Sequence, residues 1–255
     1  MKLYKLTNQE GLTHGETQWA ENITHSIEPC DDPELCTDKV IHAYRNINLG
    51  LLLNPIYGDI QDPIIWEAEG DICIEDYGKV GCFQLTTIRK LETPEWYAEE
   101  ISRSKTQIQF AILCAEKVLH IYEEKYPQDN RPRKAIEAAK NCLNTRFSSD
   151  YTTDDAVYVA DVTDADNAAE AAANAAEDAA TEATNDADYH VAACAACACT
   201  AYAASDVGAI YVARAAYAAH VAQAAYAAFH NIATAIDLEK IADQAVEMIH
   251  KDDKE

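Results

Sequence analysis

The chain has 255 residues and a formal net charge of −24 at pH 7, and 49% of its residues are hydrophobic, enough to build the cores of one large or two modest domains. The strong acidity argues against direct binding to nucleic acid, because Lys and Arg supply most of that affinity by neutralising phosphates. The nine cysteines are an odd number without regular spacing, so a reducing compartment is expected rather than a disulfide framework.

Two further features bound the organisation of the chain. No apolar run reaches the roughly 20 residues that a membrane-spanning helix needs, and the first residues lack the apolar core of a signal peptide, so a cytoplasmic protein is expected. The composition also changes near residue 94, where Trp, Pro and β-branched residues give way to alanine. Because such shifts mark domain boundaries, we expect domains at residues 1–93 and 94–255.

Four stretches of the first domain alternate between apolar and polar residues, as half-buried strands do. They are residues 2–7, 40–44, 64–69 and 80–90. Asp76-Tyr77-Gly78 separates the last two and predicts a hairpin. Residues 8–38 have little periodicity and are predicted to be mostly loop. Residues 47–53 predict a short buried helix that ends at Asn54-Pro55. This pattern predicts an α+β unit with a small, mainly antiparallel sheet.

The first helices of the second domain have clear boundary signals. Thr93-Pro94-Glu95 combines an N-cap hydroxyl, proline at the first helical position and an acid in the first turn, so a helix is expected to begin near residue 94. Apolar residues at helical spacing continue it as far as Tyr126-Pro127. A second helix is predicted over residues 131–143, followed by a polar loop through Asp155.

The stretch from Ala156 to Ala235 contains 35 alanines among 80 residues and no proline. Alanine has the highest helix propensity but buries little surface, so these helices must pack closely on other helices. Turn and cap residues divide the stretch and predict four helices. They are residues 164–184, 187–204, 208–235 and 237–251. The expected fold class is therefore α+β, with an all-α alanine-rich domain after the sheet.

Negative charge is concentrated at residues 150–189, which hold twelve acids and no Lys or Arg. Acids recur every eleven residues, which is nearly three whole helical turns, so they share one face. They are Asp155, Asp166, Glu177 and Asp188. This face could bind a basic groove or imitate a nucleic-acid backbone, although a surface that only keeps the protein soluble is the alternative.

The start of the helix at 131–143 gathers cations. Arg131, Arg133 and Lys134 lie beside free backbone N–H groups, which together could hold a phosphate or carboxylate. The alternative is structural: Asp129 caps the helix while the arginines pair with acids such as Glu116 and Glu123 on the preceding helix.

No metal or cofactor site is expected. His190, Cys194 and Cys197 share a helical face, but a structural zinc site usually has two ligand pairs on separate elements, so cysteine is expected here as a small apolar residue. The isolated histidines His42, His120, His220 and His230 have no nucleophile or carboxylate placed to complete a catalytic triad. An enzyme is therefore not predicted.

Residues 114–138 carry the most specific pattern in the chain, the run YPQDNRPRKAI at Tyr126–Ile136. With the alanine-rich stretch that follows, this run resembles an immunity protein family of bacterial toxin systems over residues 105–235. The resemblance implies a helical protein that neutralises a toxin by binding. Leu3-Tyr4-Lys5, Ile41-His42-Ala43-Tyr44 and Trp66-Glu67-Ala68-Glu69-Gly70 resemble an uncharacterised domain common in phage proteins.

Together these features predict a non-enzymatic, acidic, phage-associated inhibitor or immunity-type protein, located in the host cytoplasm if it is phage-encoded. Its expected partner is a protein, namely a toxin, a nuclease or a defence component. Three alternatives stay open: a sponge for a small anionic nucleotide at Arg131–Lys134, a DNA mimic, and a nucleotide-processing enzyme acting through the first domain.

Overall fold

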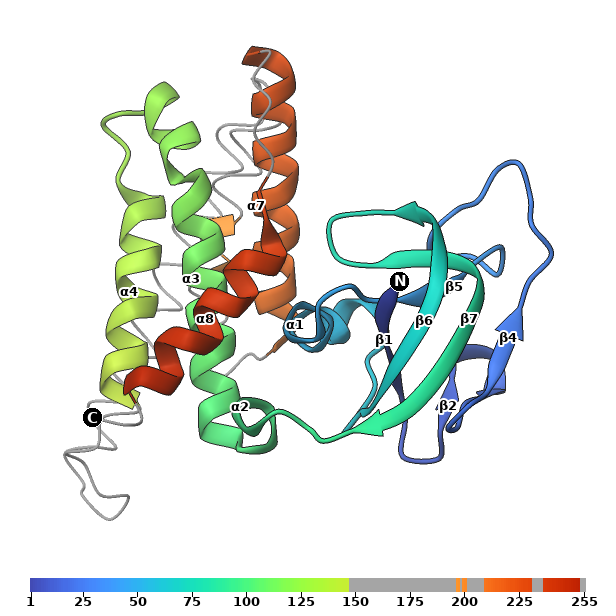
Figure 1. Ribbon diagram of the computed structural model, residues 1–255. Coiled ribbons are helices and arrows are strands. Elements are labelled where there is room, and N and C mark those ends of the chain that lie inside the picture. The colour runs from blue at the N-terminus through green and yellow to red at the C-terminus, as the bar shows by residue number, and fades with distance from the viewer. Residues whose placement is uncertain (147–195, 198, 201–208, 231–235, 253–255) are drawn as a thin grey trace. The chain divides into compact units, whose positions relative to one another are not determined.

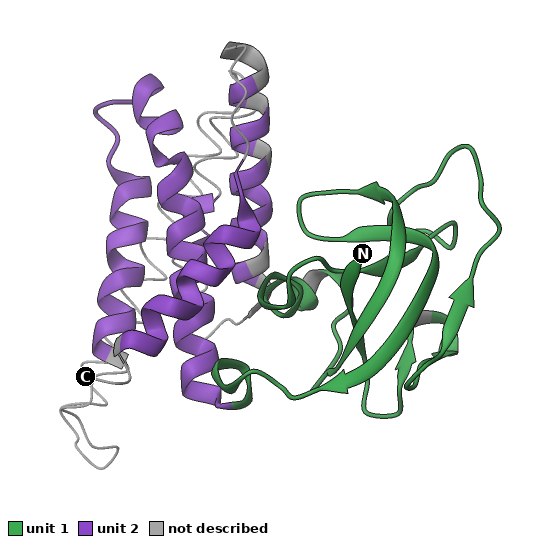
Figure 2. Ribbon diagram, in the orientation of Figure 1, with its two compact units in different colours: residues 1–98 green, residues 99–255 purple. Residues whose placement is uncertain are grey.

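A computed structural model describes residues 1–146, 196–197, 199–200, 209–230 and 236–252. The chain forms two compact units, residues 1–98 and 99–255 (Figure 2). Every strand that the structure describes lies in the first unit, whereas the described elements of the second unit are helices (Figure 1). The predicted α+β class, an antiparallel sheet followed by a helical region, is confirmed.

The sheet of the first unit is antiparallel, with the order β1-β6-β7-β4 and with β5 also paired to β7. Its strands are β1 (Lys2–Thr7), β4 (Thr24–Ser26), β5 (Ile41–Ala43), β6 (Ile64–Glu75) and β7 (Val80–Leu91). A separate small hairpin joins β2 (Leu12–Thr13) to β3 (Thr17–Gln18) around the 3₁₀ turn η1 (His14–Glu16). Residues 8–38 are mostly loop, as predicted, and the strands within them were not anticipated because two or three residues are too few to show a period.

The β6–β7 hairpin is the largest element of the sheet, and β6 continues six residues beyond the predicted end at residue 69. The Asp76 carboxylate closes the turn by accepting from the backbone N–H groups of Gly78 and Lys79, both at 2.8 Å. The extension was missed because register shifts between Gly70 and Ile74 break the alternation. Gly70 fits there because a Cβ atom would lie 2.6 Å from the Gln84 carbonyl oxygen.

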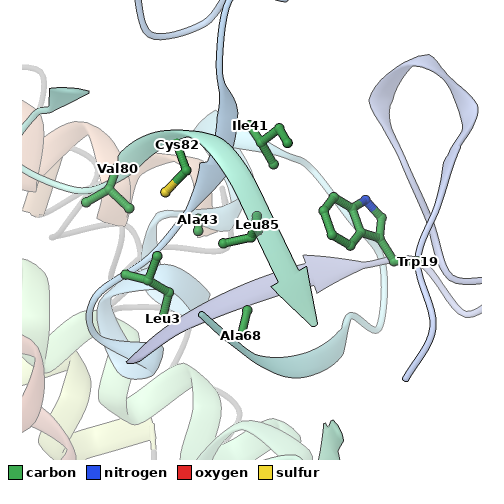
Figure 3. Close-up of a cluster of buried hydrophobic side chains, with 8 residues drawn as sticks. All are labelled: Leu3, Trp19, Ile41, Ala43, Ala68, Val80, Cys82 and Leu85. Atoms are coloured by element: carbon green, nitrogen blue, oxygen red, sulfur yellow. The ribbon is translucent and has the colours of Figure 1, made fainter. Parts of the chain in front are cut away.

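A cluster of eight buried side chains lines the inner face of this sheet (Figure 3). They are Leu3, Trp19, Ile41, Ala43, Ala68, Val80, Cys82 and Leu85. Trp19 comes from the segment that was expected to be loop, and it is only 2% exposed. Burial of such a large side chain fixes a segment that has little regular structure of its own.

Helix α1 (Ile47–Tyr57) packs a run of fully buried leucines, Leu51 to Leu53, into the first unit. Asn46 caps it by accepting from the Leu49 N–H at 2.9 Å. The helix was expected to stop at Asn54-Pro55 but continues to Tyr57, because Pro55 lies in the last turn and interrupts only one intrahelical bond. The Asn54 carbonyl accepts from both Gly58 and Asp59, which ends the helix.

The predicted helix start near residue 94 is confirmed as α2 (Glu95–Ala98), but the helix is not continuous. Glu99 has an extended backbone (φ −91°, ψ 126°) and acts as the N-cap position of α3 (Glu100–Lys125). Trp96 explains the separate turn, since it is 2% exposed and its indole N–H donates to the Asn48 side chain at 2.9 Å. A tertiary contact therefore decides where the helix breaks.

The second unit is built around α3, which contacts α4 (Arg131–Arg146), α7 (Ala209–His230) and α8 (Leu238–Asp252) (Figure 1). Because neighbours cover it on several sides, 14 of its 26 residues are buried. Helix α7 packs on α3 through small side chains, among them the fully buried Ala215, Ala219 and Ala222. The prediction that alanine helices pack closely on other helices fits this arrangement.

The predicted helix at 164–184 lies outside the described residues, as does most of the one at 187–204. Of the latter, residues 196, 197, 199 and 200 are helical. Thr200 places this piece against α3, because its hydroxyl donates to the Ala111 carbonyl at 3.1 Å. The other two predicted helices are observed over the described residues as α7 and α8, and α8 begins and ends one residue later than predicted.

Candidate partner-binding surface at one end of the helical unit

The α3–α4 junction, defined here as residues 122–134, is organised by Asp129. Its carboxylate accepts from the backbone N–H of Arg131 at 3.0 Å and from the Arg131 guanidinium at 2.7 to 3.1 Å. The Tyr122 hydroxyl donates to the same carboxylate at 2.8 Å. Asp129 therefore caps α4 and also ties the end of α3 to its start.

Electrostatics at Asp129 follow from this geometry. The Arg131 guanidinium and its hydrogen bonds, helped by the Tyr122 hydroxyl, lower the pKa of Asp129 to about 2 from its usual 3.8. The carboxylate is therefore ionised throughout the physiological range, and the Asp129–Arg131 pair has no net charge.

The next cation of the junction, Arg133, is bound in the same way. Its guanidinium makes two hydrogen bonds of 2.7 and 2.8 Å to the Glu123 carboxylate on α3, and Glu123 raises the pKa of Arg133. About two turns further along α4, Lys140 pairs with Glu116. Lys134 is exposed on the first turn of α4. Of the three residues expected to bind an anion, Arg131 and Arg133 thus bind carboxylates of this chain.

A second feature at the same end was not found from the sequence. The Tyr226 hydroxyl on α7 lies 3.0 and 3.2 Å from the two Glu124 carboxylate oxygens, and the His120 ring meets the Tyr226 ring edge-on at 5.6 Å. These residues are about one hundred positions apart in the chain, and only the packing of α7 on α3 brings them together. Together with Tyr126, whose ring is tilted by 36° against the Tyr122 ring at a centroid distance of 4.9 Å, they form an aromatic and charged end of the unit.

Other predicted site residues lie elsewhere. Asp155, Asp166, Glu177 and Asp188, the expected acidic face, lie outside the described residues, as do His190 and Cys194. Cys197 is buried in the short described helical piece. Among the residues that the structure describes, no group of three or more His, Cys, Asp or Glu side chains could hold a metal ion. Within the described part of the chain, no helix is long and apolar enough to cross a membrane.

Comparison with known families gives one match, to the family described as immunity protein Imm5, over residues 97–240. This match covers more than half of the chain. The chain belongs to the Imm5 immunity protein family. No curated protein and no solved structure matches it.

The Imm5 match begins at α2 and ends in the first turn of α8, so it contains α3, α4 and α7 with the whole α3–α4 junction. The resemblance to an immunity protein family that the YPQDNRPRKAI run indicated is confirmed. Residues 1–96, with the sheet and α1, lie outside the match. The family assignment therefore concerns the helical unit.

Proposed function

We propose that this chain is a non-enzymatic immunity protein that neutralises a toxin protein by forming a stoichiometric complex with it. The observation that carries the proposal is the Imm5 match over residues 97–240, which includes the three longest described helices of the second unit. A rigid helical unit provides fixed side-chain positions, and binding by preorganised surfaces needs no catalytic group.

We further propose that the toxin contacts the aromatic and charged end of the helical unit. Tyrosine and arginine are enriched where proteins bind one another, because they combine large contact area with directional hydrogen bonds. This end presents Tyr126, Tyr226 and Arg131 together with the exposed Lys134. The Asp129–Arg131 ion pair and the Tyr226–Glu124 hydrogen bonds fix two of these side chains before binding, which lowers the entropy that association must overcome.

The test begins with affinity capture of the toxin by the full chain from its natural host, followed by expression of that toxin with and without the chain. We expect survival only when the chain is present, a one-to-one complex on size-exclusion chromatography, and protection that disappears once toxin exceeds the chain in molar amount. Protection at a small fraction of the toxin concentration would instead indicate catalytic turnover and would overturn the proposal.

The docking surface is tested separately with Lys134→Glu, compared with Lys251→Glu on the exposed side of α8 as a control that changes the charge equally. Exposed positions tolerate such changes, so both variants should fold. We expect Lys134→Glu to weaken the complex at least tenfold and Lys251→Glu to leave it unchanged. If both variants bound the toxin with equal affinity, the toxin would not contact the junction, and the proposed immunity function would be unaffected by this result.

A further inference from the structure

Cys36 and Lys79 in the first unit form a close pair that the immunity function does not use. Lys79 directly precedes β7, and Cys36 lies in the segment before β5, 43 residues away in sequence. The Lys79 Nζ atom lies 2.7 Å from the Cys36 Sγ atom. This separation would be short even for an N–H···O bond, whose usual length is about 2.9 Å, and sulfur is a larger atom than oxygen.

The lysine is held in place by its surroundings. It is only 6% exposed, and its ammonium group lies 4.0 Å from the centroid of the Tyr57 ring, a favourable cation–π position. Its backbone N–H is bound to the Asp76 carboxylate in the β6–β7 turn. These contacts hold the lysine nitrogen beside the sulfur.

The cysteine is also held in place, although the residue is exposed to solvent. Cys36 has a left-handed backbone (φ 64°), which is uncommon for a residue with a side chain, and its N–H donates to the His42 ring nitrogen at 2.9 Å. Cys36 is nevertheless an exposed residue. A small oxidant in solution can therefore reach the sulfur while the nitrogen stays beside it.

We infer that Cys36 and Lys79 form a site of oxidative modification, at which dioxygen joins the lysine nitrogen to the cysteine sulfur through one bridging oxygen atom. The Lys79 amine and the Cys36 thiol react with one molecule of O₂, forming one N–O and one O–S bond, breaking one N–H bond, the S–H bond and the O–O bond, and releasing one molecule of water. The nitrogen and the sulfur each give up one hydrogen atom, and both hydrogen atoms leave in the water with the second oxygen atom of O₂. Nitrogen and sulfur are oxidised by two electrons each, and O₂ accepts all four.

This modification would act on the fold of the first unit. The bridge ties the segment before β5 to the β6–β7 turn, and a cross-link between distant positions stabilises mainly by restricting the unfolded chain. Thiol reductants cleave sulfur–oxygen bonds of this oxidation level, so the bridge is reversible. The site lies outside the Imm5 match, and it does not depend on toxin binding.

The test uses the full chain purified under argon with a thiol reductant, then transferred without reductant to air-saturated buffer. Intact mass spectrometry should show the gain of one oxygen atom and the loss of two hydrogen atoms, reversed by dithiothreitol. Peptide mapping should give one linked peptide that contains both Cys36 and Lys79. The thermal midpoint of the first unit should rise by several degrees in the oxidised form.

Lys79→Arg keeps the cation over Tyr57 but removes the reacting amine, so it should abolish the mass change, as should Cys36→Ser. Cys30→Ser removes another exposed cysteine of the same segment, and this variant should still show the mass change. An unchanged mass in air, a gain of oxygen alone at Cys36, a disulfide with Cys30, or the same mass change in Lys79→Arg would each overturn the inference. The peptide map of the parent decides the question even if a variant fails to fold.

Discussion

Asp129 combines a helix cap, an ion pair and a hydrogen bond to Tyr122, so its charge contributes to the stability of the helical unit. We expect Asp129→Asn to lower the free energy of unfolding by roughly 1 kcal/mol at pH 7, because the amide keeps a cap acceptor but loses the charge-assisted contacts to Arg131. Chemical denaturation of parent and variant measures this difference.

The pH dependence of that difference has a defined sign. The folded-state pKa of Asp129 is lowered to about 2 from 3.8, so the stabilisation is complete above about pH 4 and is lost as the pH falls toward 2. The difference in free energy of unfolding between the parent and Asp129→Asn should therefore become smaller as the pH falls from about 4 to about 2. A gap that does not depend on pH would show that the cap geometry, and not the charge, stabilises the junction.

Arg131→Ala distinguishes the two uses considered for the junction. If Arg131 is structural, the variant melts at a lower temperature and responds to added nucleotides as the parent does. A nucleotide that raises the melting temperature of the parent but not of the variant would instead support the sponge alternative, since a ligand that binds only the folded state stabilises it by mass action. Thermal melts with and without nucleotide give the answer.

His42 makes the first unit sensitive to acid. Burial, together with the positive charges of Lys79 and Lys5, lowers the pKa of His42 to about 4 from 6.5. Below pH 6.5 the unfolded chain therefore takes up a proton that the folded unit does not, so stability is lost as the pH falls from about 6.5 to 4. His42→Gln keeps an acceptor for the Cys36 N–H but has no group that takes up this proton. Between pH 6.5 and 4 we expect its free energy of unfolding to fall by about 1 to 2 kcal/mol less than that of the parent, allowing for solvent screening.

Urea unfolding of both proteins at pH 7, 5.5 and 4.5 measures this effect. Only the difference between the two proteins is informative, because acid also acts on groups that both proteins share. Parallel losses of stability in parent and variant would show that His42 does not carry the acid sensitivity.

At the scale of elements, helix α7 depends on small side chains. Its alanines are buried on the side that packs on α3, and a larger residue there has no room without displacing a helix. We expect Ala219→Leu, at a fully buried position, to lower the free energy of unfolding by about 1 to 3 kcal/mol. Ala224→Leu, at an exposed position of the same helix, should have almost no effect because leucine is also a good helix former.

Denaturation of the two leucine variants in parallel checks the expectation. Equal stabilities would mean that the α3–α7 interface is loose enough to accept three added carbon atoms, and that alanine is present in α7 only for its helix propensity.

At the scale of the whole molecule, the net charge of −24 is the dominant property, and residues 150–189 hold twelve of the 44 acids. On the sequence alone, we predict that this surface speeds association with a basic partner, because complementary charge mainly raises association rates. Replacing Asp155, Asp166, Glu177 and Asp188 with Asn or Gln should slow association with the toxin at low salt. At physiological ionic strength, screening beyond about 8 Å should reduce the difference.

A matched control removes the same charge from the first unit, at four exposed acids. They are Glu10, Glu21, Glu28 and Asp31. Association rates across a salt series, measured with the toxin identified above, separate a directed effect from one of net charge. If association with the toxin slowed equally in both variants, the effect would come from total charge. If it slowed in neither, the acidic residues would serve only to keep the protein soluble.

The sequence by itself determined the fold class, the hairpin and the boundaries of several helices, because hydrophobic period and cap residues act locally. It also determined the family, since the YPQDNRPRKAI run is contiguous. Tertiary structure decided what depends on distant contacts: the break at Glu99, set by the Trp96–Asn48 hydrogen bond, and the extension of β6 through its bulges.

The candidate surface divides in the same way. Arg131 and Arg133 were found from sequence because both lie close to Asp129, and Glu123 was already named there as a possible partner, but only the geometry assigns Glu123 to Arg133 and Asp129 to Arg131. Glu124 and Tyr226 meet across 102 positions, and Lys79 and Cys36 across 43. No local pattern encodes such pairs, because their proximity results from how the helices and strands pack.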